Sequence, residues 1–499
     1  MEMQLPKKKL EYMNRLVHEV KSQELTQELR MPDEMPDTGK ILNTWGQILI
    51  RGKQWQADSV TVSGGVMAWV LYVPEKGDQQ PQIVETWIPF QMKLDLPQTP
   101  YDGNITVVPY LCSTDARSTS ARKMMLRVTV ALYTDCWVAD QAEVFQPQQT
   151  EGVYTLTKRY PLTLAREAGE KEFTIEEELT LPPSCPPIEK IVRFSIQPEL
   201  IDCKVLSGKV AFRGVALLHI LYMDAQDVLH CWDFEIPFSQ YDELGTQYEQ
   251  QATANIYPVV TSLELDTDTS GKLLLKAGII GQYVIYDTTV IEVTEDAYSP
   301  NHIIELKTEQ LRVPAVLDET QKTVTMTGIL SEPDADIADI GVCMRPPKFE
   351  RYAENGKIQL SGAFHVLQYE EGQLCGITIP WENSQEFTLG DKTQLQQTGV
   401  ISGIPKAERS GNGLQLSVDV LLRSVITGKE GITVIRDMTI AQKQTRDSNR
   451  PSLILMKGNG SSLWELAKTC GSTVETIRQA NGLQQEPGPD QILLIPVVS

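Results

Sequence analysis

The residue types that bind metal ions are present in this chain, but their spacing matches no complete metal site. The segment Asp266–Gly271 (DTDTSG) has alternating side-chain oxygens followed by a glycine, as at the start of a calcium-binding loop. The position that would have to supply a bidentate glutamate is occupied by Ala277. We therefore predict a hairpin turn in this segment and no metal site.

The five histidines and eight cysteines are dispersed through the sequence. No H-x-x-x-H or H-E-x-x-H pattern occurs, and His230 is the only histidine within four residues of a cysteine, Cys231. A zinc site needs three or four clustered ligands. His219 and His365 lie in apolar segments that we expect to be strands, where a hydrogen-bonded structural histidine is more common than a ligand. We therefore expect no metal and no cofactor.

Sequence motifs of the common catalytic sites are also missing. There is no G-x-S-x-G, no phosphate-binding loop and no G-x-G-x-x-G. A cysteine and histidine pair could form only between residues far apart in the sequence, without a flanking signature. The cysteines form no C-x-x-C pair, which favours scattered, reduced thiols over a disulfide framework. We expect no catalytic residue and predict that the chain is not an enzyme.

The charge and the distribution of apolar residues exclude several classes of partner. The 45 Lys and Arg against 66 Asp and Glu leave a net charge of −21, which disfavours binding to nucleic acid or anionic lipid. The most apolar stretch, Val215–Met223, is far shorter than the roughly 20 residues of a membrane span. The early lysines, Lys7 to Lys9, are followed by LEYMNRLVHEV and not by the apolar run of a signal peptide. We therefore expect a cytoplasmic protein.

The elements that must carry these residues are arranged in repeats. The segment Leu29–Leu42 (LRMPDEMPDTGKIL) matches Leu179–Val192 (LTLPPSCPPIEKIV) in its apolar, proline and lysine positions, 150 residues later. A weaker third copy, Ile329–Val342 (ILSEPDADIADIGV), follows after another 150 residues. Self-similarity at a fixed spacing indicates tandem copies of one domain.

The same series of elements follows each copy. An apolar strand begins with glycine and ends in tyrosine, and an Ile-Pro-aromatic tripeptide comes next, where proline should end a strand or lie at a sheet edge. A turn and an alternating apolar strand then indicate a hairpin. The strands are Gly64–Tyr72, Gly214–Tyr222 and Gly362–Tyr369, and the tripeptides begin at Ile88, Ile236 and Ile379. We predict a mainly β protein with three tandem β-sandwich or barrel-like repeats.

The predicted domain organisation covers the whole 499-residue chain, which is long enough for several cores. Apolar residues between Leu10 and Leu25 lie three or four apart, which predicts an amphipathic helix before the first repeat. The predicted segments are an N-terminal helix (1–27), three β repeats (28–177, 178–327 and the degenerate 328–441), a polar linker (442–452) and a small α+β domain (453–499).

The last domain is predicted to have the order strand, helix, helix, strand. Ser462 and Glu465 form a capping box for the first helix, and Gly471 can adopt the left-handed conformation that ends it. Ser472 and Glu475 form a second capping box. Because this βααβ unit has an apolar core of its own, we expect few contacts across the polar linker.

This last segment resembles a LysM domain. The matching residues are Gly460-Ser461-Ser462-Leu463-Trp464, Ala467-Lys468, Thr473-Val474, Asn481-Gly482-Leu483 and Leu494-Ile495-Pro496. The resemblance implies a binding groove formed by Gly458, Asn459, Gly460, Ser461, Ser462, Leu463, Asn481, Gly482 and Leu483. In the LysM family this groove binds polymers of N-acetylglucosamine. The glycines and capping residues are equally required by the turns and caps, and without export a protein partner is favoured over a wall glycan.

The β repeats followed by one LysM domain resemble the clostridial spore-coat morphogenetic protein SipL and its relatives. The resemblance implies a non-enzymatic scaffold in spore coat assembly, located in the mother-cell cytosol at the forespore surface. It also implies that the LysM domain docks onto the ATPase of the coat basement layer. The alternative is a cell-wall or cortex protein that binds peptidoglycan through N-acetylglucosamine. A signal peptide or a sporulation gene context would discriminate between the two.

Overall fold

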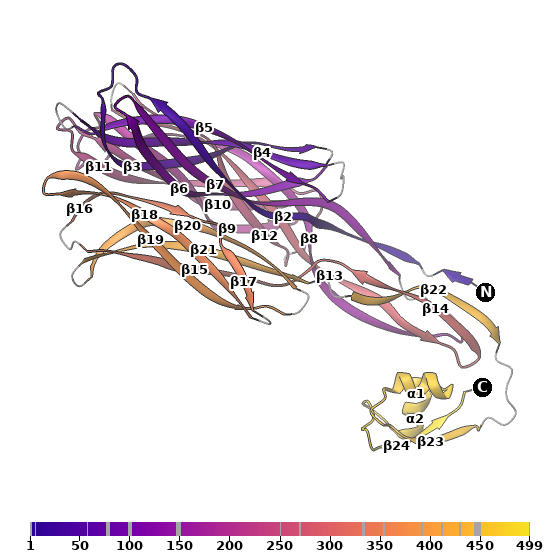
Figure 1. Ribbon diagram of the computed structural model, residues 1–499. Helices are drawn as coiled ribbons and strands as arrows, with labels where there is room; N and C mark the ends of the chain where they lie inside the picture. The colour runs from indigo at the N-terminus through magenta and orange to yellow at the C-terminus, as the bar shows by residue number, and fades with distance from the viewer. Residues whose placement is uncertain are drawn as a thin grey trace.

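The fold is almost entirely β, and its strands are grouped into three units, a stalk and a small C-terminal domain (Figure 1). The structure is a computed structural model. It describes all residues except 1, 5, 57, 76–79, 98–101, 146–150, 250, 269–270, 332–334, 353–354, 391–392, 411–412, 429–430, 444–450 and 499. The mainly β fold agrees with the prediction from the sequence.

The first unit has six strands in two antiparallel sheets. One sheet is the meander β3-β4-β5, and the other has the order β2-β7-β6, so the first strand of the unit pairs with the last. Apolar side chains of both sheets share one core, as in a β-sandwich. The strands are β2 (Lys7–Arg30), β3 (Thr38–Gln56), β4 (Ser59–Pro74), β5 (Gln82–Asp95), β6 (Asn104–Ser120) and β7 (Lys123–Phe145).

The same pairing pattern occurs in the second unit, with the meander β9-β10-β11 and the strands β8-β13-β12. The latter three strands belong to a six-stranded sheet that continues into the third unit through one bridge, between Thr163 and Val316. The long first and last strands again pair along most of their length. The strands are β8 (Tyr154–Leu179), β9 (Lys190–Leu206), β10 (Lys209–Met223), β11 (Leu229–Glu243), β12 (Thr253–Thr267) and β13 (Leu273–Tyr298).

The third unit has this pattern with one interruption. Its meander begins with two short strands, β16 and β17, that both pair with β18 in place of one continuous strand. Pro346 and Pro347 lie between them, and proline lacks the N–H that a sheet ladder requires. The strands are β15 (Ala315–Leu330), β16 (Asp336–Met344), β17 (Lys348–Tyr352), β18 (Asn355–Glu370), β19 (Gln373–Thr388), β20 (Thr393–Ser410) and β21 (Gly413–Gly428).

The recurring sequence features occupy equivalent places in the three units. The glycine-to-tyrosine segments lie in β4, β10 and β18, each the central strand of its three-stranded meander. Pro89, Pro237 and Pro380 lie in β5, β11 and β19, which are edge strands. An edge strand tolerates proline because one side of its backbone has no partner. The expectation for these prolines is confirmed.

The prediction of an N-terminal helix over residues 1–27 is wrong. Residues Lys7–Arg30 form the single strand β2, which pairs with β7 over its whole length. A β-bulge between Arg15 and Val17 shifts the inward-facing positions by one residue. Before the bulge even-numbered residues such as Leu10 face the core, and after it odd-numbered residues such as Leu25 do. This shift gives a strand the three- and four-residue spacing of a helix.

The three units begin one strand earlier than the sequence repeat suggests. The predicted boundaries at 27/28, 177/178 and 327/328 fall within the last residues of β2, β8 and β15. Each of these strands pairs with the last strand of the unit that follows it, so it belongs to that unit. The repeated proline-rich segment is therefore a connection between the two sheets of one unit and does not mark its start.

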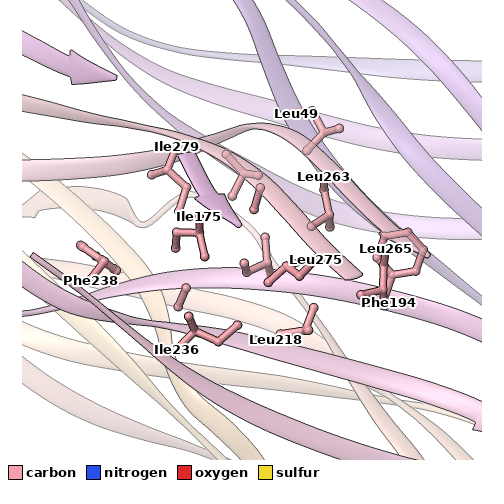
Figure 2. Close-up of a cluster of buried hydrophobic side chains, with 14 of the residues drawn as sticks. Leu49, Ile175, Phe194, Leu218, Ile236, Phe238, Leu263, Leu265, Leu275 and Ile279 are labelled. Atoms are coloured by element: carbon pink, nitrogen blue, oxygen red, sulfur yellow. The ribbon is translucent and has the colours of Figure 1, made fainter. Parts of the chain in front are cut away.

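The three units are joined edge to edge around a common centre. Within each unit, an edge strand of the meander lies beside an edge strand of the other sheet, and between units β3 contacts β12, β16 contacts β6, and β9 contacts β20. The six strands therefore form a closed ring, which gives the body an approximate threefold arrangement. Figure 2 shows the core shared across one junction, where Leu49 of β3 lies near Leu263 of β12.

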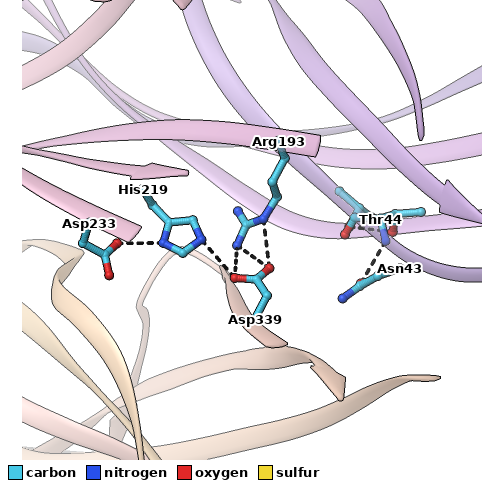
Figure 3. A network of polar contacts seen from close by, with 7 residues as sticks. Asn43, Thr44, Arg193, His219, Asp233 and Asp339 are labelled. Carbon is cyan, nitrogen blue, oxygen red and sulfur yellow. Dashed lines mark hydrogen bonds and ion pairs between the residues drawn. The ribbon is translucent and has the colours of Figure 1, made fainter. Parts of the chain in front are cut away.

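A buried ionic network also connects the units (Figure 3). Arg193 of β9 donates hydrogen bonds of 2.7 to 2.9 Å to both carboxylate oxygens of Asp339 on β16. His219 of β10 bridges Asp339 (Nε2 to Oδ1, 3.0 Å) and Asp233 of β11 (Nδ1 to Oδ1, 2.7 Å). The Arg193 guanidinium lies over the ring of Trp45 in the first unit. One cluster thus joins all three units.

The network shifts the pKa values of its members. Burial alone would raise the pKa of Asp339, but the charge of Arg193 and the hydrogen bond with His219 outweigh burial and lower it to about 2. Burial and the charge of Arg193 would lower the pKa of His219, but its hydrogen bonds with Asp233 and Asp339 raise it above the usual value. Both shifts favour the charged forms, so the network is stabilised as an ionic cluster.

A stalk extends from the body. The ends of β2, β7, β8 and β13 continue beyond the units and pack against a small sheet with the order β1-β22-β14. Phe145, Leu164 and Val293 are buried in its core. The strands of the small sheet are β1 (Glu2–Gln4), β14 (His302–Arg312) and β22 (Gly431–Lys443). In Figure 1 the C-terminal domain lies near the end of the stalk.

Candidate binding site on the C-terminal domain

The C-terminal domain has the predicted βααβ order. Its antiparallel strands and two helices surround a core that includes the fully buried Leu463, Ile477 and Leu493. The capping box of Ser462 and Glu465 is present, and Gly471 ends the first helix with a φ of 66°. The elements are β23 (Leu453–Lys457), α1 (Leu463–Cys470), α2 (Val474–Asn481) and β24 (Ile492–Pro496).

The second capping box was predicted at the wrong residue. The N-cap of α2 is Thr473, whose side chain accepts a hydrogen bond from the Thr476 backbone N–H. Ser472 is fully buried and donates its hydroxyl hydrogen to the Pro496 carbonyl. Ser472 therefore fastens β24 to the start of α2 and is not free to act as the cap.

The first predicted groove segment, Gly458 to Leu463, forms the loop between β23 and α1. Asn459 and Gly460 are exposed and have positive φ values of 48° and 78°, which turn the chain sharply between the strand and the helix. Ser461 and Ser462 are half-buried. Leu463 has a fully buried side chain in the core, so only its backbone could contact a ligand.

The second predicted groove segment, Asn481 to Leu483, ends α2. The Asn481 amide donates to the Leu494 carbonyl (2.6 Å) and its oxygen accepts from the Leu494 N–H (2.7 Å), which holds β24 in place. Gly482 has a φ of 60° and is exposed, and Leu483 packs at the edge of the core. Asn481 therefore has a structural role, while Gly482 is open to a partner.

Glu486, which the sequence analysis did not single out, links the two segments. Its carboxylate accepts a hydrogen bond of 2.8 Å from the Leu463 backbone N–H and lies 3.9 Å from the Arg478 guanidinium in the last turn of α2. A carboxylate at a helix N-terminus is stabilised by the helix dipole. A ligand oxygen that needed the Leu463 N–H would have to displace Glu486.

The opposite side of α1 is attached to the end of β13. The Trp464 indole donates to Asp296 (2.8 Å), the Lys468 ammonium lies 2.7 Å from the same carboxylate, and the Tyr298 hydroxyl donates to the Ser472 carbonyl. Tyr298 is 5% exposed and belongs to the core of the C-terminal domain. The expectation of few contacts between this domain and the rest is therefore wrong.

No local pattern in the sequence predicts this attachment. Asp296 and Tyr298 lie more than 140 residues before the domain that they contact. They are at the end of β13, which pairs with β8 up to Tyr298. Tyr154 stacks on Tyr298 with ring centroids 5.5 Å apart, and burial raises the pKa of Tyr298 to about 12. The phenol is therefore neutral and acts as a hydrogen-bond donor.

The exposed groove loops offer backbone and small polar groups, which suit binding more than bond chemistry. Among the described residues, no group of three or more His, Cys, Asp or Glu side chains is placed to hold a metal. Of the Asp266–Gly271 segment, Thr269 and Ser270 lie outside the described residues. The Asp268 N–H donates to the Lys272 carbonyl, and the Lys272 N–H donates to the Asp268 carboxylate, so these two residues close a turn. No disulfide bond joins any two cysteines among the described residues.

The remaining predicted features are placed as follows. His219 belongs to the ionic network, and His365 is 7% exposed with Nδ1 3.3 Å from the Thr378 hydroxyl. Gln442 and Lys443 of the predicted linker belong to β22, and residues 444–450 lie outside the described residues, as does Pro333 of the third sequence copy. In the part of the chain that the structure describes, no helix is long and apolar enough to cross a membrane.

Fold and site together define a multidomain β-sandwich protein with a terminal βααβ domain that presents exposed loops. A family model described as "SipL, SPOCS domain" matches residues 187–268. This match confirms the resemblance to SipL for the second unit. No curated protein and no solved structure matches the chain.

Proposed function

We propose that this chain is a non-enzymatic scaffold in spore coat assembly, built from three tandem SPOCS-type units and a terminal LysM domain. The observation that carries the proposal is the family match in the second unit, combined with the same strand pairing in all three. The matched residues span β9 to β12, the meander and the strand after it. Their counterparts are β3 to β6 and β16 to β20.

The shape of the molecule supports a scaffold role. Three units locked around one centre make a rigid body, and the paired ends of the long strands in the stalk carry the C-terminal domain to one end of the molecule (Figure 1). A domain held at the tip by Asp296 and Tyr298 presents its loops in a fixed orientation. Such an orientation favours repeated, regular contacts in a layered assembly.

We propose that the βααβ domain is a LysM domain and that its exposed loops bind the ATPase of the coat basement layer at the forespore surface, in the mother-cell cytosol. Asn459, Gly460 and Gly482 are exposed on these loops. The alternative ligand is a glycan containing N-acetylglucosamine. The hydrogen bond from the Leu463 N–H to Glu486 favours the protein partner, because one backbone donor of the groove is already occupied.

Binding of the purified full chain to the coat ATPase and to chitin oligomers, measured side by side, tests this proposal. We expect the ATPase to bind more tightly than the oligomers. Ser461→Arg places a large side chain in the first loop and should weaken ATPase binding at least tenfold. Ser118→Arg, an exposed serine of β6, is the matched control and should leave binding unchanged.

Two results would contradict the proposal. One is glycan binding that is tighter than ATPase binding and is lost in Ser461→Arg. The other is normal forespore localisation of the Ser461→Arg chain in sporulating cells, since the proposed docking requires this loop.

A further inference from the structure

A cavity of about 400 Å³ lies where the three units meet. Its wall includes residues of all six strands of the ring, together with β21. One side is the outward face of β20 and β21 in the third unit, and the opposite side is β12 of the second unit. Ligand pockets in proteins typically have volumes of about 300–1,000 Å³.

The wall of the cavity is mostly apolar. Val400 of β20 is 41% exposed although it lies at the centre of the body, because its side chain borders the cavity. Leu421 of β21 pairs directly with Val400 and also lines the cavity.

The edges of the ring cannot readily accept another strand. Pro109 of β6, Pro198 of β9 and Pro258 of β12 line the cavity, and each lacks the backbone N–H that strand addition would use. An extended peptide is therefore a poor occupant of this space. A compact small molecule fits the chemistry of the wall better.

Most charged groups of the wall already have partners. Arg193 and His219 are engaged with Asp339 and Asp233. Glu199 accepts a hydrogen bond from the Gly403 backbone N–H. These groups have little capacity left for a charged ligand.

Arg423 of β21 is different. Its guanidinium carries no ion pair with any carboxylate among the residues that the structure describes; it donates to the Gln321 side-chain oxygen (3.2 Å) and lies 5.5 Å from the centroid of the Tyr257 ring. Arg423 lies two residues after Leu421 on the same face of β21, since side chains alternate along a strand. One positive charge therefore adjoins the apolar part of the wall.

We propose that this cavity binds an amphipathic carboxylate, a small molecule with an apolar hydrocarbon body and one carboxylate group. The guanidinium of Arg423 matches the geometry of a carboxylate and supplies the missing counter-charge. The side chains of Val400 and Leu421 contact the hydrocarbon. The residues that line this cavity all lie between Thr44 and Arg423, and none belongs to the C-terminal domain. The proposal therefore does not depend on the function proposed for the groove.

Titration of the full chain with decanoate, followed by calorimetry, tests the proposal. We expect saturable binding with about one decanoate per chain. Decylammonium, which has the same hydrocarbon and the opposite charge, should bind at least tenfold more weakly. This comparison uses the unaltered chain and is independent of any effect of substitution on folding.

Two substitutions locate the site. Val400→Trp fills the cavity and should abolish decanoate binding, and Arg423→Met removes the counter-charge and should weaken it at least tenfold. Val290→Trp and Arg127→Met change exposed residues outside the cavity and should leave binding unchanged. Absence of saturable binding, equal affinity for decylammonium, or undiminished binding by Val400→Trp would overturn the proposal.

Discussion

At the residue scale, Asp339 is a buried acceptor that joins two of the units. Its carboxylate is fully buried and accepts hydrogen bonds from Arg193 and His219, which come from a different unit. Removing one member of a buried ionic cluster leaves the other charges without compensation, which costs more than the cluster itself contributes. Asp339 therefore couples the stability of the second and third units.

Asp339→Asn should lower the free energy of unfolding by about 3–5 kcal/mol, because Arg193 remains buried without its carboxylate. Chemical denaturation followed by circular dichroism measures this change. The control is Asp202→Asn, which removes a half-exposed carboxylate 3.7 Å from Lys204 and Arg213 and should cost less than about 1 kcal/mol. Equal effects of the two substitutions would show that the network is not important for stability.

His365 should make the protein less stable as the pH falls from about 6.5 to about 4. Burial, with the nearby charge of Arg193, lowers the pKa of His365 to about 4, whereas in the unfolded chain a histidine has a pKa near 6.5. Between these values the unfolded state binds a proton that the folded state does not, so stability increases with pH. The full effect is on the order of 3 kcal/mol.

Thermal unfolding of the full chain and of His365→Gln across this pH range checks the prediction. The substitution should flatten the dependence between pH 6.5 and 4. His219 acts in the opposite direction above this range, because its pKa is raised and the stability that it contributes is lost as the pH increases through that pKa. A chain whose stability is highest at pH 4 would contradict the assignment of His365.

At the element scale, the position of a strand in its sheet decides which residues it tolerates. Pro89 lies in the edge strand β5, whereas β4 is hydrogen-bonded on both sides. A residue two positions from Pro89 has its N–H on the same, unpaired side of β5, because backbone orientation alternates along a strand. Sheet position therefore predicts opposite outcomes for the same substitution.

Val66→Pro in β4 should prevent stable folding of the first unit or cost at least about 2 kcal/mol, since it removes a paired N–H and crowds a fully buried site. Gln91→Pro in β5 is the matched control and should be tolerated within about 1 kcal/mol. Circular dichroism and denaturation of the two variants provide the measurement. A well-folded Val66→Pro chain would refute the strand order assigned to this sheet.

Also at the element scale, contacts with β13 hold helix α1 of the C-terminal domain in place. Asp296→Ala removes the carboxylate that accepts hydrogen bonds from Trp464 and Lys468. A hydrogen bond to a charged group contributes at most about 1.5–3 kcal/mol to stability. We expect faster proteolysis between residues 443 and 453 and a red shift of tryptophan emission as Trp464 meets water. Asp490→Ala, an exposed carboxylate of the same domain, should change neither.

At the scale of the whole molecule, the three units are not separate globules. One core includes Leu49 of the first unit, Phe212 of the second and Leu367 of the third. Gln282 of the second unit exchanges two hydrogen bonds of 2.8 and 2.9 Å with the backbone of Val107 in the first. Domains that share a core and buried polar contacts lose stability when separated.

Calorimetry should therefore show one main unfolding transition for the β body and not three. Gln282→Leu leaves the Val107 backbone groups unpaired and should move the whole transition to lower temperature, by several degrees for a loss of about 1–3 kcal/mol. Gln226→Leu changes an exposed glutamine in the turn before β11 and is the control. Three resolved transitions, of which Gln282→Leu shifts only one, would contradict the shared core.

The sequence by itself determined the β content, the series of elements that recurs three times and the βααβ order of the last domain. Alternating apolar residues, Ile-Pro-aromatic tripeptides and capping boxes are local patterns that reflect the period of a strand or the end of a helix. The glycine-to-tyrosine segments at near-equal spacing were sufficient to predict three equivalent strands, but not their central position in the sheets. The family resemblance rested on these same local features.

Only the tertiary structure decided how these elements are combined. The bulge in β2 gave a strand the spacing of a helix, and the pairing of β2 with β7 is formed by residues more than 90 positions apart. The ring of edge strands, the ion pair of Arg193 with Asp339 and the contact of Trp464 with Asp296 likewise join distant segments. Such contacts leave no periodic signal, because each partner is also compatible with an exposed position in its own strand or helix. Their energy comes from burial in one shared interior, which exists only once the chain has folded.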